Sequence, residues 1–299
     1  MKKALELDQF FTCTDTVKKC LNTLKDFCIK NQIETKKISF LEPSAGNGQF
    51  IKEIESIFNN KNILAYDIEP KNKNIIQQNF LELNIPKNIN MITIGNPPFG
   101  YKSGLAIKFI NKSSEITNII AFILPLQFTR WNVQKQINAN LKLVYSSELL
   151  PKNSFFVEET IKNINCIFQI WINKEDKRFL HLQDLRIKKA PSIKNEDFIL
   201  YIHNNTKETL KYFDKKKYEW NFAVHRQGFY DYSKKIFNPE ELIKNRQYLF
   251  VKYVNPISKE IFKILDFEKL SNLNTVIKGY SNSNVVAEYE KIKKEKFNQ

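Results

Sequence analysis

The sequence predicts an α/β protein with an open, doubly wound, mostly parallel sheet, followed by a smaller C-terminal α+β region. Short apolar segments alternate with segments of helical periodicity over the first 175 residues. One apolar segment runs into the glycine loop of "FLEPSAGNGQF", and an acidic residue, Asp67, ends the next apolar segment. A strand, a glycine loop and a helix in this order are typical of the first unit of such a sheet.

The expected helices follow from apolar residues that recur every three or four positions. The first covers residues 15–30, the second begins in the glycine loop and covers "GNGQFIKEIESIF", and the third lies around residues 105–112. The expected strands are short apolar runs bounded by polar residues. They are "KISFLEP", "NILAYDI", "MITIGNPPF", "NIIAFILP", "LKLVYSSELLP" and "NINCIFQIWIN".

The pattern of the chain changes near residue 175. The segment "NKEDKRFLHLQDLRIKKAPSIKNED" is polar and charged, and the segments after it are short, rich in aromatic residues and weakly periodic. We therefore expect one domain over residues 1–175 and a second over residues 176–299.

The composition favours a soluble, cytoplasmic protein with a polyanionic partner. The chain has 299 residues and a formal net charge of +15, which points toward nucleic acid. The alternative is that the many lysines form solvated helix faces. No run approaches the roughly 20 apolar residues of a membrane span, so no membrane partner is expected. We expect a monomer.

The cysteines and histidines indicate neither a disulfide framework nor a metal site. The four cysteines form no CxxC pair, which is typical of buried thiols in a reducing compartment. The three histidines lie far apart with no second ligand at a suitable spacing. We therefore expect no metal.

The glycine loop and Asp67 predict a ligand that contains a ribose. Gly46 and Gly48 let a ligand approach the backbone closely, and Asp67 stands about 20 residues later, where a carboxylate can accept from both ribose hydroxyls. A dinucleotide is the competing ligand. The loop lacks the GxGxxG pattern, however, and Glu42 stands where phosphate-binding loops avoid negative charge. A ligand with a ribose, a positive sulfonium and no phosphate fits better, and S-adenosylmethionine has these features.

Three segments carry a family resemblance. "LEPSAGNGQF" and "IGNPPF" resemble the signature motifs of the class I S-adenosylmethionine-dependent amino-methyltransferases, chiefly the adenine N6 methyltransferases. "LDQFFTCTDTVKKC", residues 7–20, is similar to the family's first cofactor-contacting motif, and the order of the three matches the γ arrangement. The resemblance implies a seven-stranded methyltransferase sheet, a catalytic domain over residues 1–175 and target recognition by residues 176–299.

The resemblance also implies a set of cofactor-binding residues. They are Phe11, Thr12, Glu42, Pro43, Ala45, Gly46, Gly48, Asp67, Ile68, Asn79 and Phe80. The sequence departs from the family at two places. Cys13 and Thr14 stand where relatives usually have a proline, and Asn79 replaces an Asp that accepts from the adenine amine of the cofactor. Asn79 can still accept through its carbonyl, though more weakly.

The residues of "NPPF" suggest how a weakly nucleophilic amine is activated. The lone pair of the adenine amine is delocalised into the ring, and two acceptors held against its N–H bonds would free the lone pair for attack. Asn96 can supply a side-chain carbonyl and Pro97 a backbone carbonyl, while Pro97 and Pro98 stiffen the loop. Phe99 offers a ring on which the base can stack. A plain Asn-Pro turn is the alternative for this motif taken alone.

An extrahelical base would need a second aromatic wall, and DNA would need a recognition surface. By family position the wall is Phe155 or Phe156, although both could equally belong to the core. In the C-terminal region His225 and Arg226 lie among aromatic and basic residues, which could contact the substrate or form the core of a small domain.

The leading hypothesis is a site-specific DNA adenine N6 methyltransferase of the restriction-modification type. Methylation of adenine in RNA is a close alternative because the same site would hold any unstacked adenine. Methylation of a protein glutamine amide is a third reading, against which Phe99 and the basic charge argue. A nucleic-acid-binding module without catalysis is the fourth, against which the intact "NPPF" argues.

Overall fold

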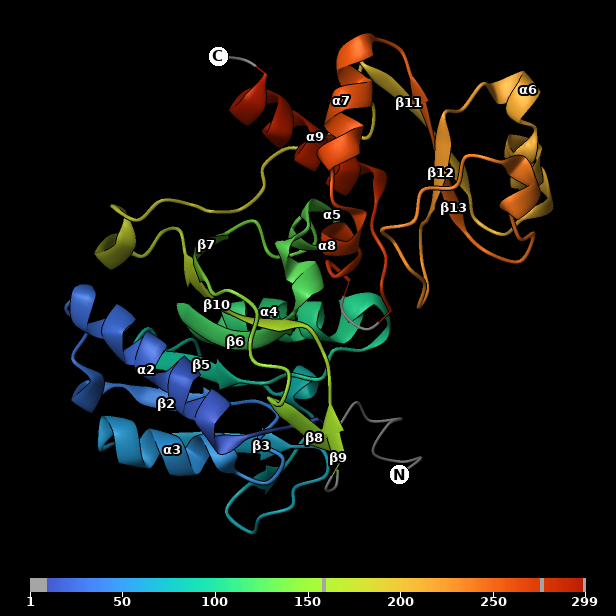
Figure 1. Ribbon diagram of the computed structural model, residues 1–299. Coiled ribbons are helices and arrows are strands. Elements are labelled where there is room, and N and C mark those ends of the chain that lie inside the picture. The colour runs from blue at the N-terminus through green and yellow to red at the C-terminus, as the bar shows by residue number, and fades with distance from the viewer. Residues whose placement is uncertain (1–9, 158–159, 275–276, 298–299) are drawn as a thin grey trace. The chain divides into compact units, whose positions relative to one another are not determined.

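The structure is a computed structural model that describes residues 10–157, 160–274 and 277–297 (Figure 1). Residues 7–9 of the motif "LDQFFTCTDTVKKC" lie outside the described residues. The chain divides into two compact units, residues 1–189 and 190–299. Each unit has its own sheet and its own hydrophobic core.

The first unit is built on a seven-stranded sheet with the strand order β4-β3-β2-β5-β6-β10-β7. The strands are β2 (Ser39–Glu42), β3 (Ile63–Asp67), β4 (Ile76–Gln77), β5 (Met91–Gly95), β6 (Ile119–Pro125), β7 (Leu141–Ser146) and β10 (Cys166–Asn173). The five strands from β4 to β6 are parallel, and β10 is antiparallel to both of its neighbours. The predicted fold class, an α/β fold with a mostly parallel seven-stranded sheet, is confirmed.

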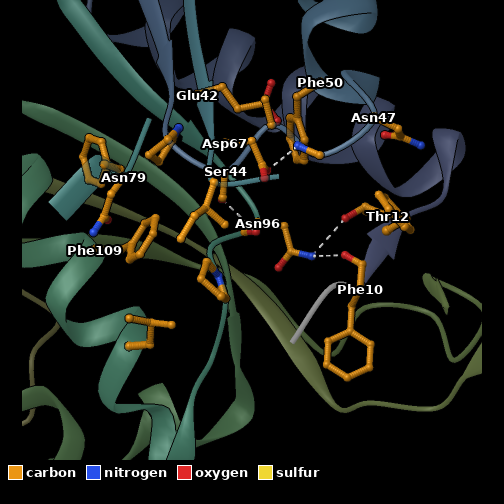
Figure 2. Close-up of a pocket in the computed structure, with 18 of the residues that line it drawn as sticks. Phe10, Thr12, Glu42, Ser44, Asn47, Phe50, Asp67, Asn79, Asn96 and Phe109 are labelled. Carbon is orange, nitrogen blue, oxygen red and sulfur yellow. Dashed lines mark hydrogen bonds between the residues drawn. The ribbon is translucent and has the colours of Figure 1, made fainter. Parts of the chain in front are cut away.

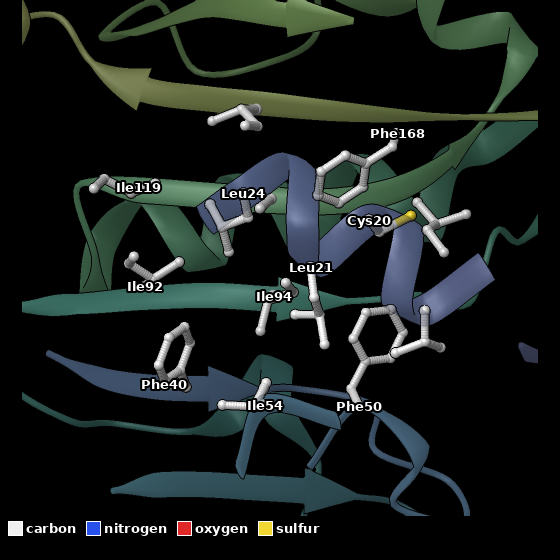
Figure 3. Packing of buried hydrophobic residues seen from close by; sticks show 14 of the residues in the cluster. Cys20, Leu21, Leu24, Phe40, Phe50, Ile54, Ile92, Ile94, Ile119 and Phe168 are labelled. Atoms are coloured by element: carbon white, nitrogen blue, oxygen red, sulfur yellow. The ribbon is translucent and has the colours of Figure 1, made fainter. Parts of the chain in front are cut away.

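Helices cover both faces of this sheet, because both faces carry apolar residues. Helices α2 (Thr14–Lys30) and α3 (Gln49–Phe58) pack on one face, where Leu21, Leu24 and Ile54 meet the strands (Figure 3). Helix α4 (Gly104–Ile116) packs on the other face. Along β6, Ile119 and Ile123 belong to the first cluster, whereas Ile120 and Leu124 belong to the second. This alternation is expected for a strand that is buried on both sides.

A small sheet holds the segment before α2 in place. Strand β1 (Phe11–Thr12) pairs with β8 (Phe155–Val157), which forms a hairpin with β9 (Thr160–Lys162). Ser154 strengthens the attachment, because its backbone carbonyl accepts from the N–H of Cys13 at 2.9 Å and its hydroxyl accepts from Thr16 Oγ1 at 2.9 Å. Phe11 and Thr12 are therefore fixed relative to the sheet by residues more than a hundred positions later in the chain.

Residues 176–189 belong to the first unit although their composition is polar. Phe179 is fully buried in the core, with its ring 5.9 Å from the ring of Phe27. The Arg186 guanidinium donates to four backbone carbonyls at 2.6–3.1 Å, those of Gln134, Ile137, Asn138 and Leu141. The short helix α5 (Trp131–Gln134) and the start of β7 are thereby tied to this segment. The change of composition near residue 175 thus precedes the end of the first unit.

The second unit has an α+β structure, as expected for the C-terminal region. Its three-stranded antiparallel sheet has the order β11-β13-β12, and the helices lie mainly after the last strand. The elements are β11 (Phe198–His203), α6 (Lys215–Tyr218), β12 (Phe222–His225), β13 (Tyr248–Tyr253), α7 (Pro256–Ile264), α8 (Phe267–Ser271) and α9 (Asn282–Lys296). Among the helices of the described residues, none is both long and apolar enough to cross a membrane.

We predict that Arg186→Ala destabilises the first unit by about 2–4 kcal/mol, because four backbone carbonyls lose a charged donor. Urea unfolding of the full chain, followed by circular dichroism, measures the effect. Lys188→Ala, which truncates an exposed side chain of the same segment, is the matched control. An Arg186 variant as stable as the control would contradict this role of residues 176–189.

Candidate functional site

A cavity of about 460 Å³ lies at the edge of the first unit's sheet where β2, β3 and β5 end (Figure 2). Its walls come from the residues that directly follow these strands, such as Pro43, Ile68 and Asn96. Because the three strands are parallel, their carboxyl ends meet at one edge of the sheet, which is the usual place for ligands in open α/β sheets. The volume lies within the range of small-molecule sites, about 300–1,000 Å³.

The glycine loop after β2 forms one wall of the cavity. Gly46 has a φ of +52°, and a Cβ atom there would lie 3.1 Å from Cε1 of Phe11, so a side chain has little room. The N–H of Gly46 donates to Asp67 Oδ2 at 2.7 Å, and the N–H of Glu69 donates to Asp67 Oδ1 at 2.7 Å. The carboxylate of Asp67 thus joins the end of β3 to the glycine loop, in addition to lining the cavity.

Glu42, at the end of β2, brings a second carboxyl group to the cavity. Its side chain is buried, and its Oε2 has no hydrogen-bond partner among the described residues. Burial, with a further contribution from the negative charge of Asp67, raises the pKa of Glu42 well above its ordinary value. A buried carboxyl pair of this kind disfavours anionic ligands and favours a ligand that carries positive charge.

The side chain of Asn96, directly after β5, is held in one orientation. Its Nδ2 donates to the backbone carbonyl of Phe10 at 3.1 Å and to Thr12 Oγ1 at 3.2 Å (Figure 2). Both hydrogens of the amide are thereby used. The other amide atom, Oδ1, is buried and has no partner among the described residues. Since a buried carbonyl oxygen without a donor costs about 1–3 kcal/mol, this site is suited to a ligand that donates an N–H or O–H.

Aromatic and aliphatic side chains form the other end of the cavity. The ring of Phe80 lies 5.2 Å from the ring of Phe109, which comes from α4. Asn79 is oriented by its neighbours, because its Oδ1 accepts from the N–H of Leu81 at 3.1 Å and its Nδ2 donates to Glu82 at 2.7 Å. This end has the apolar character that suits the planar ring of a nucleoside.

The cavity brings together most of the residues that the sequence singled out. Those that line it are Phe11, Thr12, Glu42, Pro43, Ala45, Gly46, Asp67, Ile68, Asn79, Phe80, Asn96 and Pro98. Gly48 and Pro97 are neighbours in the same loops but are not part of the wall. Phe99 points away into the hydrophobic core, where its ring lies 6.2 Å from the ring of Phe10. The roles assigned to these residues remain predictions.

The two candidates for the aromatic wall, Phe155 and Phe156, lie outside the cavity. Phe155 is fully buried in the core. A core position was the alternative to a contact with the substrate that the sequence left open for this residue. Phe156 pairs with Phe11, and the two rings lie 5.7 Å apart. Neither residue is part of the cavity wall, so a contact of either with a substrate stays a prediction.

His225 and Arg226 belong to the second unit, at the end of β12. The ring of His225 stacks between Tyr230 and Tyr248, at centroid distances of 4.3 and 4.9 Å. Burial, together with the charge of Arg246, lowers the pKa of His225 to about 4, so the ring is neutral at pH 7. Arg226 donates to the side chain of Asn204, while its Nε is buried without a partner in the described chain. The predicted contact of these two residues with a substrate stays a prediction.

Sequence reasoning missed several residues of the cavity. Phe10 acts through its backbone carbonyl, for which a sequence carries no signal. Ser44 and Tyr101 stand inside or next to the quoted motifs, and Leu105 and Phe109 share one face of α4 at a spacing of four residues. The helical spacing could have identified this last pair. In the described residues, no group of three or more His, Cys, Asp or Glu side chains is arranged to hold a metal.

Comparison of the sequence with protein-family models and with curated proteins gives no match. Comparison with solved structures gives distant matches. A protein from Pyrococcus horikoshii, provisionally described as an RNA methyltransferase, is 14% identical, with 56% of this chain and 88% of that chain covered and a TM-score of 0.41. The 23S rRNA methyltransferase ErmE is 12% identical (47% and 63% covered, TM-score 0.34). A type I restriction-modification methyltransferase subunit from Streptococcus thermophilus is 13% identical (50% and 43% covered, TM-score 0.37). Similarity this low carries no argument about activity.

We predict that Glu42→Gln stabilises the ligand-free protein at pH 8 and has little effect near pH 4. The raised pKa means that folded Glu42 holds a proton that the unfolded chain releases, so wild-type stability falls as pH rises above the ordinary pKa of Glu. Gln cannot ionise and escapes this loss. Melting temperatures measured from pH 4 to pH 8 test the prediction, with Glu55→Gln, an exposed carboxyl of α3, as the control for net charge. A stability difference independent of pH would show that Glu42 is not a protonated, buried acid.

Proposed function

We propose that this chain is an S-adenosylmethionine-dependent methyltransferase that methylates the exocyclic N6 amine of adenine in DNA. The observation that carries the proposal is the oriented amide of Asn96. Its hydrogens are bound by Phe10 and Thr12, and its buried carbonyl oxygen faces no donor among the described residues. An amine that entered the cavity would supply the missing donor.

The cavity suits S-adenosylmethionine by charge and shape. The paired carboxyl groups of Glu42 and Asp67 favour a cation over a phosphate-bearing nucleotide. Gly46 lets the glycine loop and the ring of Phe11 line the cavity together, and Phe80 with Phe109 provides an apolar place for a nucleoside ring. Asp67 and Asn79 can each accept further hydrogen bonds from the ligand. When bound, S-adenosylmethionine supplies a methyl group whose bond to sulfur breaks as the bond to the amine nitrogen forms, and the amine then loses a proton to water.

The residues of "NPPF" would activate the acceptor by geometry. In this proposal Asn96 Oδ1 accepts one N–H of the amine. The backbone carbonyl of Pro97, which lies outside the wall of the ligand-free cavity, accepts the other when the base is bound, and the two bonds localise the nitrogen lone pair. The amide cannot turn away, since turning would break its bonds to Phe10 and Thr12. Positioning of this kind can supply a large part of a methyl-transfer barrier without a strong base.

The proposed acceptor is DNA, with RNA as the second candidate. The formal net charge of +15 favours a nucleic acid over a neutral small molecule. Within this proposal the second unit recognises the target, with His225 and Arg226 among the contacts, and the enzyme works as a monomer in a restriction-modification system. The adenine must leave the base stack to reach Asn96, which a single strand or a flipped base permits.

We predict that Asn96→Ala lowers kcat at least about 100-fold while the affinity for S-adenosylmethionine stays within a few-fold, because an acceptor that acts in the transition state is lost. Asn96→Asp should also be slow, since a carboxylate cannot donate to Phe10. Single-turnover methyl transfer and calorimetry of cofactor binding measure the two quantities. Near-normal turnover of Asn96→Ala would refute the mechanism.

The first experiment is methyl transfer from labelled S-adenosylmethionine to duplex DNA, single-stranded DNA and total RNA in parallel, followed by digestion to nucleosides and mass identification. We expect label in N6-methyldeoxyadenosine. Label only in N6-methyladenosine would move the acceptor to RNA. Tight cofactor binding without label in any nucleic acid would favour a protein acceptor or a module without catalysis, and absence of cofactor binding would contradict the proposal as a whole.

A further inference from the structure

The proposed reaction needs an aromatic ring on which the acceptor base can stack. The three phenylalanines that the sequence suggested for this role, Phe99, Phe155 and Phe156, are packed against other side chains. Phe99 is 8% exposed and Phe155 is 0% exposed, since both belong to the hydrophobic core. Phe156 packs on Phe11. Phe99 and Phe155 therefore offer no ring face to a base without a rearrangement of packed side chains, and Phe156 is not part of the cavity wall.

Tyr101 offers such a face. It lines the cavity and is 84% exposed, so its ring is open to solvent at the cavity mouth. The other aromatic residues of the wall are engaged elsewhere. Phe80 and Phe109 are buried against each other, Phe50 is buried in the core, and the rings of Phe10 and Phe11 pack on Phe99 and Phe156. An exposed tyrosine in a cavity wall can stack on any base, because every base has a π-face.

The backbone around Tyr101 adopts a conformation that few residues tolerate. Gly100 has a φ of +69°, and a Cβ atom there would lie 2.6 Å from Cβ of Leu105. Lys102 and Ser103 have φ values of 52° and 65°, which costs roughly 1–2 kcal/mol for each residue with a side chain. Hydrogen bonds hold the turn, from Ser103 N–H to the Gly100 carbonyl at 3.2 Å and from Leu105 N–H to the Phe99 carbonyl at 3.2 Å. The turn holds the backbone of Tyr101, which stands two residues after the "NPPF" motif, in a defined position.

Lys102 adds a positive charge next to this ring. Its Nζ lies 5.0 Å from the centroid of the Tyr101 ring. No carboxylate pairs with Lys102 in the parts of the chain that the structure describes. An aromatic face beside an unpaired ammonium is the combination that binds an unstacked nucleotide, with the base on the ring and the phosphate near the charge.

We propose that Tyr101 and Lys102 form an acceptor lip at the mouth of the cavity, which stacks on the unstacked adenine and binds an adjacent phosphate. This inference rests on the proposed function, because it assigns the acceptor end of the same cavity. Tyr101 confers affinity for the base, and Lys102 confers affinity for the strand. The cofactor end of the same cavity is formed by other residues, among them Glu42 and Gly46.

The test compares the strand affinities of Tyr101 variants in the presence and in the absence of the adenine base, as in a double-mutant cycle. Wild type, Tyr101→Ala and Tyr101→Phe are titrated with a short labelled thymidine strand that carries one adenine, and with the same strand in which that adenine is an abasic site. We expect Tyr101→Ala to weaken binding of the adenine strand about tenfold and to leave binding of the abasic strand within twofold. Tyr101→Phe, which keeps the ring, should bind both strands as wild type does. Ile29→Ala, which truncates another exposed apolar side chain of the first unit, is the matched control.

Lys102→Ala should weaken binding of both strands and reduce the slope of log K against log salt by about 0.7, the value for one phosphate of a single strand. The proposal would be overturned if Tyr101→Ala weakened binding of the adenine strand and the abasic strand equally. It would also be overturned if Phe99→Leu, but not Tyr101→Ala, weakened binding of the adenine strand alone. Loss of S-adenosylmethionine affinity in Tyr101→Ala would instead place the ring at the cofactor. The titrations measure binding without turnover, so their result is separate from that of the methyl-transfer assay. Either proposal can therefore be refuted while the other is supported.

Discussion

The candidate site depends on one constraint, the fixed orientation of the Asn96 amide. An asparagine side chain has two nearly symmetric ends, one donating and one accepting, and only its surroundings decide which end faces a ligand. Here the carbonyl of Phe10 and the hydroxyl of Thr12 both accept, so the NH2 group must face them and the carbonyl oxygen must face away. A site that must bind an amine therefore needs the segment before α2 as much as it needs the "NPPF" motif.

That segment is itself held by distant parts of the chain. β1 has only two residues and could not be stable alone. It is held by pairing with β8 and by the hydrogen bonds of Ser154 to Cys13 and Thr16. The hairpin of β8 and β9 thus acts on the site indirectly. Through β1 it determines where Thr12 lies, and Thr12 in turn determines how Asn96 is oriented.

The electrostatics of the cavity complement this geometry. Glu42 and Asp67 end adjacent parallel strands, so the sheet itself brings two carboxyl groups to one edge. Burial, with a smaller contribution from the charge of Asp67, raises the pKa of Glu42, which leaves the ligand-free site with a poorly solvated acid. A cation relieves this cost and a phosphate increases it. The proposed preference for a cationic, ribose-bearing ligand and the unpaired carbonyl oxygen of Asn96 both depend on the same strand order.

The sequence by itself determined the strands, the helices on both faces and the loops at the strand ends, because apolar periodicity and glycine placement are local signals. It therefore predicted a doubly wound, mostly parallel sheet and placed Glu42, Asp67 and Asn96 at the ends of its strands, whereas the number of seven strands followed from the family resemblance and the short strand β4 carried no local signal. Only the tertiary structure decided that Phe99 and Phe155 enter the core, that Tyr101 stays exposed, and that Arg186 ties residues 176–189 to the first unit. The exposure of a ring and the partners of a guanidinium depend on segments far away in the chain. No local pattern predicts the contacts between distant segments, because packing is a property of the whole fold.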